Sequence, residues 1–64
     1  MALTIRIPKT HPELNRRAAV LRARVIAETK GHKADELHRP KTRLEHVEGP
    51  ALWEYVIEFP DASS

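Results

Sequence analysis

The chain has 64 residues, no cysteine and a formal net charge of +2. A chain of this length forms at most one domain, and it buries a smaller fraction of its surface than a larger protein does. Without cysteine, neither a disulfide nor a thiolate metal site can stabilise the fold, and small domains of this kind often gain apolar contacts from a second copy. We therefore expect one domain over residues 1–64 that forms a homodimer.

The charges are divided unevenly along the chain. All 11 Lys and Arg residues lie within 1–43 beside four acidic residues, which gives this part a net charge of +7. Residues 44–64 carry five acidic residues and no Lys or Arg, which gives −5. This division fits a basic surface for nucleic acid or an acidic protein. It fits equally well an internal pairing of the basic and acidic segments.

Residues 3–7 alternate between apolar and polar side chains, which is typical of a half-buried strand. Leu3, Ile5 and Ile7 are predicted to face the core, and Thr4 and Arg6 to face outward.

The longest periodic stretch predicts a helix over 11–30. Thr10 and Glu13 have the spacing of a capping box, and Pro12 is tolerated in a first helical turn. Gly31 follows the predicted helix and can turn the chain.

A spacing of 100° per residue divides this helix into two apolar stripes. The first is predicted to face the core and consists of Leu14, Ala18, Leu21 and Val25. The second has mostly small side chains, which would let another helix approach closely. We predict it as the homodimer interface, consisting of Ala19, Ala23, Ile26 and Ala27; the alternative is that its alanines are only good helix formers on a solvated face.

The remainder predicts a loop over 31–41 with one helical turn near 33–38, a hairpin over 42–59 and a flexible tail over 60–64. The hairpin strands are predicted at 42–48 and 52–59, with Trp53, Tyr55 and Phe59 on one face toward the helix. The fold class is therefore α+β, with the order β-α-β-β and a three-stranded antiparallel sheet packed on one long helix.

The sequence offers little for catalysis. The four histidines have spacings that match no known metal site (His11, His32, His38 and His46). The only serines are the last two residues, and two glycines do not make a phosphate-binding loop. We expect a protein that is not an enzyme and holds no metal or cofactor.

Binding is the remaining class of function, and basic side chains are its candidate contacts. They are Arg6, Arg16, Arg17, Arg22, Arg24, Lys30, Lys33, Arg39, Lys41 and Arg43. In size and in its lack of cysteine and motifs, the chain resembles small inhibitors or adaptors from phages and mobile elements, including anti-CRISPR proteins. This resemblance implies a non-catalytic protein that binds and modulates a larger protein or nucleoprotein complex.

A second resemblance favours direct binding of DNA or RNA by a dimeric regulator. The segment 3–8 resembles the N-terminal strand of ribbon-helix-helix repressors, and 31–37 is similar to their inter-helix turn. In that family the outward residues of a dimeric ribbon, which match Thr4 and Arg6, enter the major groove. Independently of the family, the basic residues could contact phosphates.

No apolar run is long enough to span a bilayer, and the first residues lack the order of a signal peptide. We expect a cytoplasmic protein of a bacterial cell, encoded by the cell or by a phage.

Overall fold

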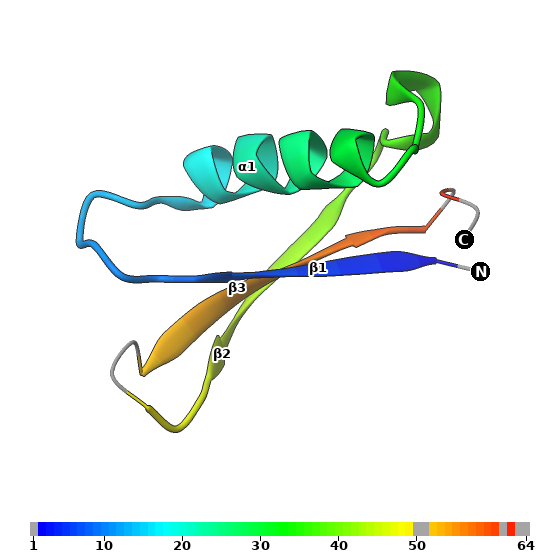
Figure 1. The fold of residues 1–64 in the computed structure, drawn as a ribbon. Helices are drawn as coiled ribbons and strands as arrows, with labels where there is room; N and C mark the ends of the chain where they lie inside the picture. The colour runs from blue at the N-terminus through cyan, green and yellow to red at the C-terminus, as the bar shows by residue number, and fades with distance from the viewer. Residues whose placement is uncertain (1, 50–51, 61, 63–64) are drawn as a thin grey trace.

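The computed structural model describes residues 2–49, 52–60 and 62. In chain order the elements are β1 (Leu3–Pro8), α1 (Arg16–Thr29), the short 3₁₀ helix η1 (Ala34–Glu36), β2 (Lys41–His46) and β3 (Trp53–Phe59). The strands form one antiparallel sheet in the order β1-β3-β2. The predicted fold class, α+β with one helix on a three-stranded antiparallel sheet, is confirmed (Figure 1).

The core lies between α1 and the central part of the sheet. The helix packs against β1 and β3 and covers one face of the sheet (Figure 1). From the sheet, the core contains Ile5, Ile7, Tyr55, Ile57 and Phe59, all of which are buried. These positions alternate with outward-facing ones along each strand, as the sequence pattern predicts.

The helix presents a different face to the sheet from the one predicted. Ala19, Ala23 and Ala27 have no exposed surface and lie in the core, whereas Leu21 is 55% exposed and Val25 is 62% exposed. Small side chains let the helix axis approach the large residues of β1 and β3, so the volume of the core comes from the sheet. The predicted core face is wrong for Leu21 and Val25.

The helix also begins later than predicted, at Arg16 instead of residue 11. Its N-cap is Asn15, whose side-chain Oδ1 accepts a hydrogen bond from the backbone N–H of Ala18 at 2.9 Å. The preceding segment stays irregular because Leu14 is buried in the core and its carbonyl accepts a hydrogen bond from the Tyr55 hydroxyl at 3.3 Å. The predicted capping box of Thr10 and Glu13 is therefore wrong.

The end of α1 agrees with the sequence. Gly31 has a φ of 96°, and the N–H of His32 bonds to the carbonyl of Ala27 at 3.1 Å, the pattern of a Schellman C-cap. The predicted helical turn in the following loop is the 3₁₀ helix η1. Leu37, directly after η1, is buried, so this loop contributes to the core as well as connecting two elements.

The hairpin forms as predicted, with a shorter second strand. β2 covers 41–46. After β2, the N–H of Val47 bonds to the carbonyl of Leu52, and the N–H of Leu52 bonds to the carbonyl of Gly49. The predicted turn 49–51 includes residues 50 and 51, which lie outside the described residues. Trp53 is 44% exposed, so the prediction that all three aromatic side chains lie under the helix is wrong for this residue.

Of the predicted tail, residues 61, 63 and 64 lie outside the described residues. Ala62 is buried and its N–H bonds to the carbonyl of Phe59 at 3.2 Å, so at this position the prediction of a flexible tail is wrong. Within the described residues, no helix has the length and apolar character needed to cross a bilayer.

The buried alanine stripe gives a direct test of the helix orientation. Ala23→Leu adds volume where the helix contacts the sheet and should lower the free energy of unfolding by about 1–3 kcal/mol. Leu21→Ala removes a mostly exposed side chain and should lower it by less than about 1 kcal/mol. Denaturant unfolding of both variants measures this, and the reverse order would place the alanines on the outside.

The helix start can be tested in the same way. Asn15→Ala removes the side-chain acceptor at the N-cap and should cost about 1 kcal/mol of stability. Thr10→Ala is the control, because Thr10 lies outside the helix, and its effect should stay within about 0.5 kcal/mol. Equal losses in both variants would indicate that the helix begins at the earlier position.

Candidate functional site

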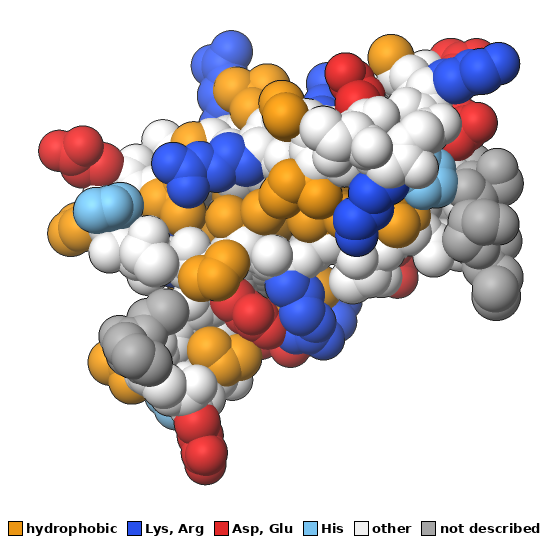
Figure 2. Space-filling model, in the orientation of Figure 1, with side chains coloured by type: hydrophobic (Ala, Val, Ile, Leu, Met, Phe, Trp, Pro, Cys, Tyr) orange, Lys and Arg blue, Asp and Glu red, His pale blue; other side chains and the backbone are white. Residues whose placement is uncertain are grey.

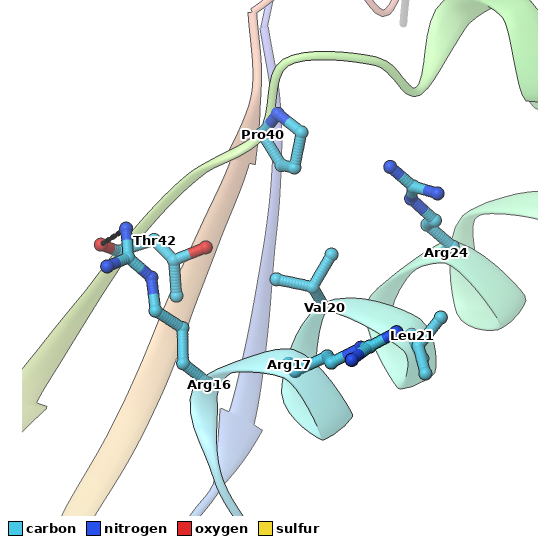
Figure 3. A pocket seen from close by; sticks show the side chains of 7 residues that line it. All are labelled: Arg16, Arg17, Val20, Leu21, Arg24, Pro40 and Thr42. Atoms are coloured by element: carbon cyan, nitrogen blue, oxygen red, sulfur yellow. Dashed lines mark hydrogen bonds between the residues drawn. The ribbon is translucent and has the colours of Figure 1, made fainter.

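A groove runs between α1 and the start of β2. It has a volume of about 580 Å³ and is lined by Arg16, Arg17, Val20, Leu21, Arg24, Pro40 and Thr42. Its position follows from the fold, because the helix packs on β1 and β3, whereas β2 is the strand on the far side of β3. In Figure 3, Val20 points from the helix into the space beside Pro40. The floor is therefore apolar.

Three arginines surround this apolar floor. Arg16 donates a hydrogen bond from Nη2 to the backbone carbonyl of Thr42 at 3.4 Å, which links the helix to β2 (Figure 3). Arg17 and Arg24 form no ion pair within the part of the chain that the structure describes. Their charges are thus available to a carboxylate or phosphate from outside.

The groove continues into an exposed apolar ridge on the helix. Leu21 and Val25, four residues apart on the same face, line a second depression of about 420 Å³ together with Arg22 and Ile26. Figure 2 shows hydrophobic side chains gathered in a band between helix and sheet, with Lys and Arg side chains along it. Apolar surface beside unpaired arginines is typical of protein interfaces.

On the sheet side, the face of β2 toward the helix is also open. Leu44 is 44% exposed, and at the hairpin end Trp53 is exposed to the same extent. The Trp53 ring meets the His46 ring edge to face, with 5.0 Å between centroids. The helix leaves these side chains uncovered because it lies over the other two strands.

The opposite face of the sheet carries a network of internal ion pairs. Arg6 bonds to Glu54 and, at 3.3 Å, to Glu45, and Arg43 bonds to Glu45. Glu45 and Glu54 lie directly opposite each other on neighbouring strands, so Arg6 offsets a repulsion between like charges. Part of the charge asymmetry of the sequence is therefore paired within the chain.

This network also covers an apolar residue. Val56 has no exposed surface and lies opposite Arg6 on β1 and Arg43 on β2. The alkyl arms of the two arginines shield it. Hydrogen bonds from Arg43 and, as the smaller effect, from Arg6 lower the pKa of Glu45. Hydrogen bonds to Glu54 and, as the smaller effect, to Glu45 raise the pKa of Arg6.

The ten predicted basic contacts do not form one surface. Three lie on the outer face of the sheet (Arg6, Lys41 and Arg43), and three line the groove (Arg16, Arg17 and Arg24). The others are Arg22 beside the apolar ridge, Lys30 and Lys33 near the C-terminal end of α1, and Arg39 in the loop before β2.

The predicted dimer interface on the alanine stripe does not fit the structure. Ala19, Ala23 and Ala27 are enclosed between the helix and the sheet of the same chain, and Ile26 packs partly against that core. Side chains with no exposed surface cannot contact a second molecule without unfolding, so these three alanines cannot form a homodimer interface.

The geometry expected from ribbon-helix-helix repressors is also absent from the described residues. β1 pairs along its whole length with β3 of the same chain instead of forming a ribbon with a second copy. Arg6, which matches an outward strand residue of that family, is engaged by Glu45 and Glu54. The segment after Gly31 contains only the 3₁₀ helix η1 before β2 begins.

The histidines are dispersed. His32 lies 3.2 Å from Glu36 through Nδ1 and Oε2, and His46 contacts Trp53. Among the described residues, no group of three or more His, Asp or Glu side chains is placed to hold a metal ion.

Comparisons with protein-family models, curated proteins and solved structures found no match to this chain. The function is therefore argued from the geometry of the molecule.

The sequence pointed to the arginines of the groove, but it did not point to the apolar side chains beside them. Leu21 and Val25 were predicted in the core because they share one stripe with Leu14 and Ala18 at helical spacing. The stronger signal was the spacing of Ala19, Ala23 and Ala27 together with large core-facing strand side chains such as Ile57 and Phe59, a combination that suits a closely packed helix. Pro40 and Thr42 line the groove because the loop before β2 brings the start of this strand beside the helix, and the sequence carried no signal for the path of that loop.

The ion pairs of Glu45 predict a dependence of stability on pH. Because the pKa of Glu45 is lowered on folding from its ordinary value of 4.5, its contribution is present above that value and is lost as pH falls below it. Thermal unfolding is measured from pH 6 to pH 3 in steps of about half a pH unit. The Tm of Glu45→Gln should fall less over this range than the Tm of the wild type. Glu13→Gln, which alters a carboxylate outside the network, should retain the wild-type slope. Parallel slopes for all three proteins would contradict the assignment.

Proposed function

We propose that this protein is a small non-catalytic adaptor or inhibitor that binds a larger protein through the groove between α1 and β2. The observation that carries the proposal is the combination of unpaired arginines with exposed apolar side chains on one face. Arg17 and Arg24 have no ion-pair partner among the described residues, and Leu21 and Val25 are more than half exposed beside them.

Charge complementarity indicates the chemistry of the partner. Four arginines lie on α1 and its only acidic residue is Glu28, so the surface around the groove favours an acidic segment. The apolar ridge favours aliphatic or aromatic side chains between the acidic ones, and arginine is enriched at such contacts. The partner class expected from the sequence, a larger protein or nucleoprotein complex in the bacterial cytoplasm, belongs to this proposal.

Binding of single-stranded nucleic acid is the second candidate. It is favoured by the exposure of Trp53, because an exposed aromatic ring offers a stacking surface to a base. The chain has one tryptophan, so its fluorescence reports this site alone. Quenching of Trp53 by a single-stranded oligonucleotide, lost steeply with added salt, would support this candidate.

The main proposal is tested by capture with the tagged full chain from nuclease-treated bacterial lysate, followed by titration with the purified partner. Arg17→Glu/Arg24→Glu should weaken that affinity by about tenfold or more, because two of the three arginines that line the groove are reversed in charge. Lys30→Glu/Lys33→Glu is the matched control, since it changes the net charge equally outside the groove. Its effect should stay within about threefold.

Equal weakening by both double variants would show that binding follows overall charge and not the groove. Loss of every captured species on nuclease treatment would favour nucleic acid as the partner.

A further inference from the structure

The two edges of the sheet differ in how well they are protected. β1 has its helix-side residues Ile5 and Ile7 buried under α1, and it ends at Pro8, which cannot donate to another strand. β2 contains no proline, and its helix-side Leu44 is 44% exposed. An open edge beside exposed apolar surface is a template for strand pairing.

The sequence of β2 is complementary to itself in the antiparallel direction. When Leu44 lies opposite Leu44 of a second copy, Arg43 lies opposite Glu45 on both sides of the pair. Arg43 and Glu45 share the outer face of the sheet, whereas Leu44 lies on the helix side. This alignment therefore forms two pairs of opposite charge on one face and one leucine pair on the other.

The neighbouring alignments are less favourable. Centring the pair on Arg43 or on Glu45 places two like charges directly opposite each other. A shift by a single residue places Arg43 opposite Leu44 and puts the two helices on opposite faces of the sheet, because side chains alternate with a period of two. Charge and side-chain period thus select the alignment centred on Leu44.

We propose that two copies of this chain pair antiparallel through β2, with Leu44 at the two-fold axis, to form a six-stranded sheet with both helices on one face. The intramolecular pair of Arg43 and Glu45 then becomes part of a cluster of four alternating charges. The Thr42 carbonyl, which accepts a bond from Arg16, has a second lone pair for a partner strand. Leu44 loses its exposure.

The arginines of the two grooves do not oppose this arrangement. Each helix lies over β1 and β3, so four strand spacings of about 4.8 Å separate the two helices, a distance of about 19 Å. This exceeds the Debye length of about 8 Å at physiological ionic strength, which screens their repulsion. The two grooves then face each other across the paired β2 strands.

Cysteine cross-linking tests the pairing without disrupting it, because the native chain has no cysteine. Leu44→Cys places two thiols opposite each other, with Cβ atoms about 4.5–5.5 Å apart, and a short bis-maleimide reagent should join them into a covalent dimer. Val25→Cys is the matched control, because it is also exposed but lies on the helix, far from its counterpart. We expect cross-linking at least tenfold faster for Leu44→Cys, a contrast that follows from proximity.

A charge exchange tests the alignment itself. Arg43→Glu and Glu45→Arg should each be monomeric at concentrations where the wild type has twice the monomer mass of 7.3 kDa. Mixing the two variants restores both opposite-charge pairs and should restore the dimer, measured by light scattering on a sizing column. Arg22→Glu and Glu28→Arg, which alter charge on the helix, should remain dimeric.

A wild-type mass of 7.3 kDa at millimolar protein concentration would overturn the proposal. So would equal cross-linking of the two cysteine variants, or a mixture of the charge variants that stays monomeric while both are folded by circular dichroism. None of these measurements includes the binding partner, so their outcome does not depend on the proposed function.

Discussion

The close packing of α1 on β1 and β3 is the constraint on which the rest of the molecule depends. Three alanines with no exposed surface form the helix side of this contact, so the helix lies near the isoleucines and phenylalanine of the sheet. A helix this close covers two strands and leaves the third open. The groove and the exposed Leu44 follow from that one contact, and the open edge of β2 follows from the strand order β1-β3-β2.

The same contact determines which charges are free. Arg6 and Arg43 lie on the sheet face away from the helix, where Glu45 and Glu54 pair with them and Val56 is shielded beneath them. The arginines of α1 are on the other side of the molecule, away from these carboxylates. Among the described residues, the ion pairs that join the basic and acidic halves of the sequence lie on the outer face of the sheet.

The sequence was sufficient for the fold class because each element has its own local signal. Alternation in 3–7 and in the last strand, the helical composition before Gly31, and the turn residues near 49 each specify one element. The helix start was mispredicted because Thr10 and Asn15 are both good caps. The choice between them depends on Leu14, which is held in the core by contacts distant in sequence.

The candidate site was less predictable because it depends on which helix face is buried. Leu21 and Val25 are more hydrophobic than the alanines, and a rule based on hydrophobicity alone buries the larger side chains. Shape complementarity with the sheet decided otherwise, since two layers of large residues would overfill this narrow core. A helix that exposes leucine and valine while burying alanine loses transfer free energy of the larger side chains, and contact with a partner would recover it. The exposure of Leu21 and Val25 is therefore a direct consequence of the close helix packing, and it is the apolar surface on which the proposed binding face rests.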